Sequence, residues 1–294
     1  MASLRAAWHY GFSLLIVAGL LTVTSAPALA QESAEPAKPN SGSVALTAGT
    51  DILNTYMFRG IRQDDTKVIA WPFADIGITM FSGNGGLKSV TANLGTWNSL
   101  HTGATGLDGP SGKLWYESDF YATFGLGFGG GVSLGTTYTA YTSPNSAFGT
   151  VREIAFKLGV DDSKKLGKAS LKPYGLVAFE LDGQADGGTK EGRYLELGVA
   201  PGISGKMAGV AFPTKIGLGL SNYYEMPGGG ADTRFGYFSV SGIVTVPITG
   251  IPARLGGWNV HGGVEFQALG EATKAFNGGD GSKIIGSFGI GLSY

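Results

Sequence analysis

The stretch of sequence from Trp115 to Phe128 reads WYESDFYATFGLGF. Bulky apolar residues fall on one side of a two-residue period, at Tyr116, Phe120, Ala122, Phe124, Leu126 and Phe128. Polar and small residues fall on the other side, at Glu117, Asp119, Tyr121, Thr123, Gly125 and Gly127. A period of two is typical of a β-strand whose two faces meet different surroundings. The stretch therefore predicts a strand with one apolar and one polar face.

The same alternation recurs in about twelve segments, each near the length that a tilted strand needs to cross a bilayer. Clusters of Gly, Asp, Asn and Pro separate these segments. We expect an all-β fold, an antiparallel up-and-down transmembrane β-barrel, because closure leaves no unpaired strand edge in lipid. The predicted strands are residues 44–59, 68–81, 88–99, 114–128, 131–141, 150–160, 170–181, 192–202, 211–223, 235–247, 257–269 and 283–294.

Composition indicates which face of the strands points outward. The chain of 294 residues has 51 Gly and only 15% charged residues, and its formal net charge is −1. A soluble barrel would carry many charges on its polar face. Here that face is mostly Gly, Ser and Thr, which suit a narrow wet lumen, whereas the bulky face suits lipid. The pattern therefore favours a membrane barrel over a soluble one.

A charged side chain facing lipid at mid-depth costs ~2 to 4 kcal/mol, so the charged residues of the strands are expected to point inward. A histidine on the eleventh segment shares that inward face. The candidate lumen-lining residues are Arg59, Glu117, Asp119, Glu153, Lys157, Lys172, Glu180, Glu196, Lys215, His261 and Glu265.

The two ends of the chain indicate export. Residues 1–30 combine Arg5, a short apolar run and the small residues Ala28 and Ala30, as in a cleaved signal peptide. Residues 31–43 read as a disordered periplasmic lead-in, and residues 44–294 as one barrel domain. The chain ends on a strand with Gly289, Leu292 and Tyr294, which resembles the C-terminal signal read by the barrel assembly machinery. We therefore expect a bacterial outer-membrane location, with that machinery and membrane lipid as partners.

If both ends of the chain lie on the periplasmic side, twelve strands leave six outward connections and five inward turns. The expected outward connections are residues 60–67, 100–113, 142–149, 182–191, 224–234 and 270–282. Aromatic residues near predicted strand ends are expected to anchor the barrel at the two membrane interfaces. They include Tyr56, Phe58, Trp71, Phe73, Trp115, Tyr116, Tyr223, Tyr224, Phe235, Tyr237, Phe238, Trp258 and Tyr294.

Residues able to support catalysis are few. The absence of Cys excludes thiolate chemistry, the lack of basic runs argues against nucleic acid, and we expect no metal and no cofactor. His261 and Glu265 lie ~13 Å apart along one strand, too far for a dyad. Twelve-stranded outer-membrane phospholipases use a Ser and a His, so Ser99 and His101 are weighed for a lipid-acting hydrolase. Their surroundings lack that family's motif, and we expect no enzyme.

One local motif carries a family resemblance. Thr55-Tyr56-Met57-Phe58-Arg59-Gly60-Ile61, followed by Arg62-Gln63 and a second strand Ala74-Asp75-Ile76-Gly77-Ile78, resembles the opening of the TorF-type porins. The resemblance implies an outer-membrane barrel with pore activity and lends no catalytic residues. By alternation, Arg59 is expected at the outer end of the first strand, pointing inward. There it could pair with Glu117 or Asp119, or line the mouth.

The sequence thus favours a pore for passive diffusion of small solutes. Twelve strands predict a narrow lumen, because eight enclose only side chains and sixteen leave an open channel. The slight excess of inward acids predicts a mild cation preference at most. The alternatives are a closed structural or adhesive barrel that acts through its outward connections, and the hydrolase built on Ser99 and His101.

Overall fold

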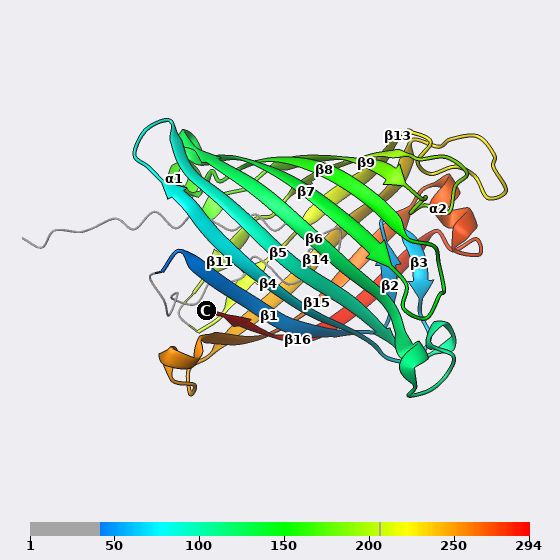
Figure 1. Cartoon of the computed structure of the whole chain (residues 1–294), viewed down its shortest axis with the longest axis horizontal. Helices are drawn as coiled ribbons and strands as arrows, with labels where there is room; N and C mark the ends of the chain where they lie inside the picture. Colours follow the sequence, from blue (N-terminus) through cyan, green and yellow to red (C-terminus); the bar gives the residue numbers. More distant parts are fainter. Residues whose placement is uncertain (1–41, 206) are drawn as a thin grey trace, which may run out of the picture.

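The computed structural model describes residues 42–205 and 207–294 as a closed antiparallel β-barrel (Figure 1). The predicted signal peptide and nearly all of the lead-in lie outside these residues. Twelve wall strands follow one another around the barrel, and β14 pairs with β15 to close it. They are β1 (Val44–Leu53), β4 (Ile69–Ser82), β5 (Leu87–His101), β6 (Trp115–Phe128), β7 (Val132–Thr142), β8 (Val151–Val160), β9 (Tyr174–Asp182), β10 (Arg193–Val199), β13 (Thr214–Ser221), β14 (Phe235–Ile248), β15 (Gly257–Leu269) and β16 (Ser282–Ser293). The predicted fold class is confirmed.

Short elements complete the barrel. The strands β11 (Gly202–Ser204) and β12 (Gly209–Ala211) prolong β10 and β13 beyond Pro201 and Pro213, where a missing N–H interrupts the ladder. The helices are α1 (Ser163–Leu166) and α2 (Glu271–Phe276). In the described part of the chain, no helix is long and apolar enough to cross a membrane. Single 3₁₀ turns occur at Ala104–Gly106, Gly112–Leu114, Gly129–Gly131, Gly167–Ala169 and Ala253–Leu255.

The two ends of the barrel differ. The terminal end holds the start of β1, the end of β16 and the connections that include α1 (Figure 1). The loop end, at the right of Figure 1, holds α2 and the six connections that the sequence predicts to point outward. Tyr294 and Leu46 exchange two backbone hydrogen bonds at the terminal end, of 2.7 and 2.8 Å. The last residue of the chain therefore helps to join β16 to β1.

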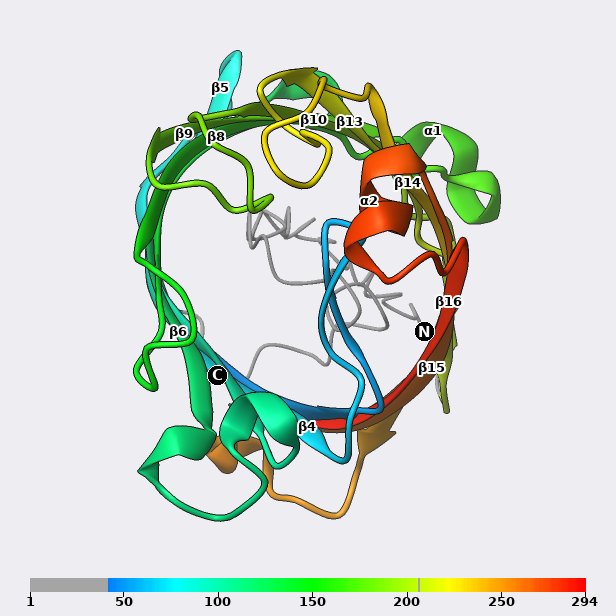
Figure 2. The same ribbon diagram turned by 90° about the vertical axis from the view of Figure 1, so that its right-hand side faces the viewer.

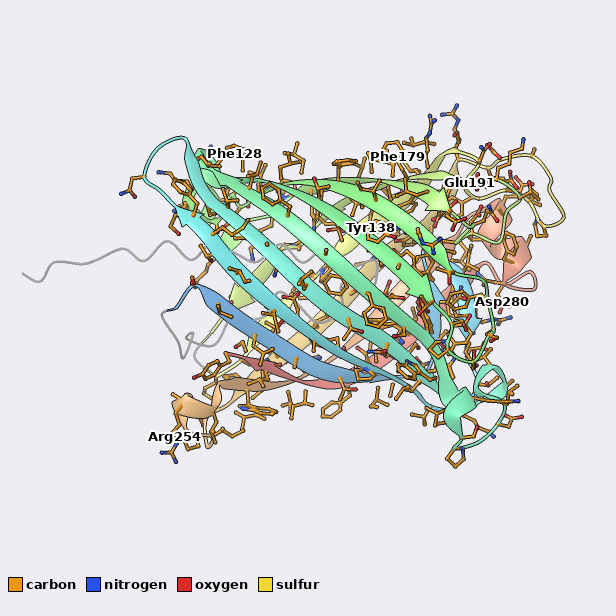
Figure 3. All side chains as sticks on the ribbon, in the orientation of Figure 1. Phe128, Tyr138, Phe179, Glu191, Arg254 and Asp280 are labelled. Atoms are coloured by element: carbon orange, nitrogen blue, oxygen red, sulfur yellow. The ribbon has the colours of Figure 1, made fainter. Side chains whose placement is uncertain are left out.

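The outer surface of the wall is apolar. Figure 3 shows Phe128, Tyr138 and Phe179 on the outside of the barrel. Exposed apolar side chains continue around it at Ile76, Leu94, Phe120, Phe124, Leu158, Leu197, Val244, Val264, Ile284 and Phe288. Among the described wall strands, outward charges occur near strand ends, at Lys88, Arg152, Asp182 and Arg193. This distribution is the one that a lipid-facing wall requires.

The chain departs from the predicted first strand at Asn54. The wall strand β1 ends at Leu53, and residues 54–68 fold into the barrel as a hairpin of β2 (Tyr56–Phe58) and β3 (Ile61–Asp64) (Figure 2). Arg59 and Gly60 form its tip, with φ of 47° and 84°, the left-handed values of a tight two-residue turn. The predicted strand 44–59 and outward connection 60–67 are therefore wrong here. The two-residue period continues through Phe58 because β2 is also a strand.

Register explains a second correction. Tyr116 was expected on the outer face with Phe120, but the pairing of β5 with β6 shifts between Ser99 and Leu100. Ser99 pairs with Glu117 and Leu100 with Trp115, so Tyr116 is an extra residue in β6, as in a β-bulge. Its side chain turns inward and is buried. Trp115, next to it, remains exposed.

Several of the aromatic residues expected at the membrane interfaces also lie inside. Buried side chains form two clusters within the loop-end half of the barrel, and they include Tyr56, Phe58, Trp71, Tyr116, Tyr223, Tyr224 and Tyr237. Glycines on the wall make room for such rings. A Cβ at Gly95 would lie 2.2 Å from Cζ of Tyr121. The bulky core of this protein is thus its lumen.

Candidate functional site: the inward hairpin and its contacts

The inward hairpin, residues 54–68, crosses the loop end of the lumen (Figure 2). At its start, Tyr56 donates a hydrogen bond of 2.9 Å to Oε2 of Glu117 on β6. The Tyr56 ring also packs edge to face against Trp71 of β4, with centroids 5.1 Å apart. The hairpin is therefore anchored to the wall by its first residues.

The tip of the hairpin carries Arg59 to the opposite wall. Its guanidinium forms two hydrogen bonds with Glu153 of β8, of 2.7 and 2.8 Å, and a third of 3.0 Å with the hydroxyl of Tyr223. It also lies 4.1 Å from the ring centroid of Tyr194 on β10. Tyr224 donates 2.9 Å to the carbonyl of Arg59. Arg59 is thus paired with Glu153 and not with Glu117 or Asp119.

The returning strand β3 joins a buried polar chain. Asp64 accepts a hydrogen bond from Thr105, which bonds Nδ1 of His101 at 2.5 Å, and Nε2 of His101 bonds Ser99 at 2.7 Å. Burial opposes the charge of Asp64, but hydrogen bonds from Thr105 and Thr66 outweigh it and hold the pKa of this carboxyl below its usual range. Asp64 therefore remains an ionised tether at neutral pH.

Ser99 and His101, the pair considered for a hydrolase, are joined by the hydrogen bond between Oγ and Nε2 that a Ser–His pair uses to activate the hydroxyl. Both side chains are fully buried, and Ser99 also accepts 2.9 Å from Nε1 of Trp71. Tyr116 stacks on the His101 ring, with centroids 4.2 Å apart. In this arrangement the pair links the hairpin to β5 and offers no surface to a substrate.

The connection 270–281 holds the hairpin from the β16 side. Asn277 accepts 2.7 Å from the backbone N–H of Arg62 and donates 2.8 Å to the carbonyl of Gly60. Lys283 of β16 donates 2.6 Å to Asp65, and this ion pair holds the pKa of Asp65 low. The hairpin and β16 border an open depression of about 640 Å³, which is lined by Asn54, Thr55, Asp65, Lys67, Asp280, Ser282, Lys283 and Ile284.

The other candidate lumen residues divide into separate groups. Glu117 and Asp119 lie side by side on β6, and both are buried. Glu180 accepts backbone hydrogen bonds from Ala185 and Gly192, which fold the connection 183–192 inward. Lys172 lies in the connection 161–173, at the terminal end, and not on a strand.

Two neighbouring groups lie along β8, β9, β10 and β13, which follow β6 and β7 around the barrel. Glu196 accepts hydrogen bonds from Tyr174, Tyr194 and Tyr237, and lies 3.5 Å from Lys215. Lys157 lies over the Tyr174 ring, 4.3 Å from its centroid.

The remaining candidates lie where the barrel closes. His261 bonds Asp51 at 2.7 Å across β16, and Gly289 lies between them in the strand pairing. Ser239 donates 2.6 Å to Glu265. Leu292 pairs with Ala48 and Trp258, so the C-terminal residues are part of the closing strand. Among the described residues, no group of His, Asp and Glu has the arrangement of a metal site.

Sequence reasoning missed the residues that fold inward from the connections. Asp64, Tyr223, Tyr224 and Asn277 each hold the hairpin, although none lies on a wall strand. The only available signal was the crowding of Tyr at predicted strand ends, which fits an interface belt equally well.

No protein-family model matches the chain, and no curated protein matches its sequence. Solved structures with a related shape include an outer membrane channel from Pseudomonas putida F1, at 12% identity and TM-score 0.47, covering 89% of this chain and 100% of that one. The translocator domain of the autotransporter NalP from Neisseria meningitidis matches at 14% identity and TM-score 0.41, over 86% and 89% of the two chains. The NanC porin matches at 10% identity and TM-score 0.38, over 85% and 98%. At such low likeness, the functions of these proteins do not transfer to this chain.

Proposed function

We propose that this chain is an outer-membrane pore for passive diffusion of small solutes, with its passage controlled at the loop end by the inward hairpin. The observation that carries the proposal is the kind of contact that holds the hairpin. Tyr56, Arg59, Asp64 and Asp65 attach it through hydrogen bonds and ion pairs to several different strands and connections. Such contacts can be replaced by hydrogen bonds to water when the hairpin moves, at a net cost of about 0.5–3 kcal/mol for each hydrogen bond.

The lining of the lumen supports a mild cation preference. Its acidic residues outnumber its basic ones in the described wall strands, with Asp51, Asp75, Glu117, Asp119, Glu153, Glu180, Glu196 and Glu265 against Lys157, Lys215 and Lys283. A lumen with an excess of one charge concentrates counter-ions of the opposite charge. Membership of the TorF-type family, export through a cleaved signal peptide and insertion by the barrel assembly machinery belong to the same proposal.

Liposome swelling with neutral, cationic and anionic solutes of equal size tests the pore. The proposal expects permeability above that of protein-free vesicles, with cations entering slightly faster than anions. The absence of any permeability above the protein-free level would contradict it.

A second candidate function is a closed barrel that acts through its loop end. The filled outer lumen favours this alternative, because the hairpin contacts β4, β6, β8 and β16. The two functions differ in one measurement. With the hairpin intact, a structural barrel would keep the swelling assay silent, whereas a gated pore would be permeable; shortening the hairpin would open either barrel.

A further inference from the structure

The guanidinium of Arg59 occupies a complete cation cage. Glu153 supplies two carboxylate oxygens, Tyr223 a hydroxyl, and Tyr194 a ring face at 4.1 Å. The rings of Tyr223 and Phe58 lie 5.5 and 5.1 Å from the guanidinium carbon. A forked carboxylate contact combined with stacking on aromatic faces suits a planar guanidinium better than a compact ammonium.

Most of this cage does not belong to the hairpin. Glu153 lies on β8, Tyr194 on β10 and Tyr223 in the connection 222–234, so only Phe58 and Arg59 come from residues 54–68. Tyr141 of β7 donates 3.3 Å to Glu153 and helps to orient it. If the hairpin moved away, the wall and the connection 222–234 would together retain the carboxylate, the hydroxyl and two rings.

The vacated cage would need a cation. The side chain of Glu153 is 3% exposed, and Glu180 lies opposite it in the pairing of β8 with β9. A buried carboxylate that loses its partner is strongly destabilised. Arg59 therefore acts as a ligand tethered to the protein, at an effective concentration in the millimolar range.

We propose that the cage formed by Glu153, Tyr194 and Tyr223 binds guanidinium-type cations from solution in exchange for Arg59. The inference rests on the proposed pore function for its biological meaning, since the cage lies on the lumen wall beside the hairpin. Solutes that carry a guanidinium group would compete with Arg59, hold the hairpin away from β8 and pass through the opened mouth.

Calorimetric titration of the full-length refolded protein in detergent micelles tests the cage directly. The probe is methylguanidinium chloride, with methylammonium chloride and sodium chloride at equal ionic strength for comparison. Arg59→Ala should bind methylguanidinium about tenfold more tightly than the wild type, because the tethered competitor is gone. Arg59→Ala combined with Glu153→Gln should lose this binding.

Arg62→Ala is the matched control. It removes the neighbouring hairpin arginine, which pairs with Asp65 and does not touch the cage. Four results would overturn the proposal. The first two are no binding of methylguanidinium by Arg59→Ala, and equal binding by Arg59→Ala with and without Glu153→Gln. The other two are an equal gain in affinity in Arg62→Ala and in Arg59→Ala, and equal affinity of Arg59→Ala for methylammonium and methylguanidinium.

Refolding provides a second measurement if Arg59→Ala is unstable. Its folded yield, read from the heat-modified mobility of the barrel on a gel, should rise with methylguanidinium and not with methylammonium. No recovery with either salt, together with no binding, would overturn the cage. A protein that binds the probe but stays silent in bilayers would contradict only the pore, whereas one that conducts without binding would contradict only the cage.

Discussion

The two halves of the lumen are built from the same strands and differ in what fills them. Toward the terminal end, inward positions on β5 to β8 hold small residues such as Ser89, Gly127, Ser133 and Gly159, and the large side chains there, Lys157 and Tyr174 with Glu196 and Lys215, lie along β8 to β13. Toward the loop end, the same strands carry large or charged side chains, and the hairpin lies between them. The alternation along a strand thus determines which residues face inward, while their size determines where the lumen is closed. Passage is therefore expected to be limited chiefly at the loop end, where the hairpin crosses the lumen.

The largest effect is expected from shortening the hairpin. Leu53 and Ile69 already pair, so a linker of about four Gly and Ser residues can replace residues 54–68. Single-channel conductance in planar bilayers should rise about tenfold. Without the hairpin, only the inward side chains of the wall occupy the lumen, and a twelve-stranded barrel is wider than an eight-stranded one that side chains alone fill.

The matched control shortens the connection 249–256 at the terminal end and should leave the conductance unchanged. Equal currents from the two shortened proteins would show that the loop end does not limit passage.

The next effect concerns the ion pair at the hairpin tip. Glu153→Gln leaves the guanidinium of Arg59 buried without its carboxylate, and the side chains of the pair are 5% and 3% exposed. Breaking such a buried pair costs about 3–5 kcal/mol. Urea unfolding monitored by Tyr and Trp fluorescence should show a loss of this order.

Arg152→Ala, one residue earlier on β8, removes an exposed pair with Asp182 and should cost about 0–1 kcal/mol. Similar losses in the two variants would argue that the hairpin contact does not stabilise the barrel.

A smaller effect follows from acidification. The pKa values of Asp64 and Asp65 lie below their usual range in the folded protein. Carboxyls with depressed pKa values contribute stability above the unfolded pKa, and this contribution is lost as the pH falls through the folded pKa. Brief openings should therefore become more frequent as the pH falls below about 4. Asp64→Asn should show frequent openings at neutral pH and a weaker pH dependence, and openings that decrease on acidification would contradict this tether.

The smallest effect is expected in the terminal-end half. Ser133 lies there on β7, and Ser133→Trp should leave the wild-type conductance unchanged because the narrow part lies elsewhere. The same substitution should reduce the current of the protein with the shortened hairpin. A reduced current in the protein with Ser133→Trp and an intact hairpin would show that the narrowest part of the lumen lies in the terminal-end half.

The wall could be predicted from the sequence because its signal is local. The strand β15 alternates over its whole length and β6 does so from Glu117 onward, and the predicted ranges 257–269 and 114–128 agree with them. The first strand failed because the period of β1 resumes in β2 after only Asn54 and Thr55. Nothing in the alternation distinguishes a strand that continues in the wall from one that turns inward.

The site could be predicted only in part because its contacts join distant residues. The inward orientation expected for Arg59 and Glu153 agrees with their burial, yet 94 residues separate them in the sequence. Tyr223 lies 164 residues from Arg59. A single sequence carries no information on which of several inward carboxylates a given cation meets.

Locking the hairpin tests the central claim most directly. The chain contains no Cys, and a Cβ at Gly60 would lie 3.0 Å from Cβ of Tyr237 on β14, so a small outward shift of the hairpin tip brings the two atoms to the roughly 3.5–4.5 Å spacing of a disulfide. In the double variant Gly60→Cys and Tyr237→Cys, single-channel conductance should be closed under oxidising conditions and should rise in the same bilayer after a reductant is added. Equal conductance before and after reduction, with the cross-link confirmed by mass spectrometry, would contradict the assignment of the inward hairpin as the element that closes the barrel.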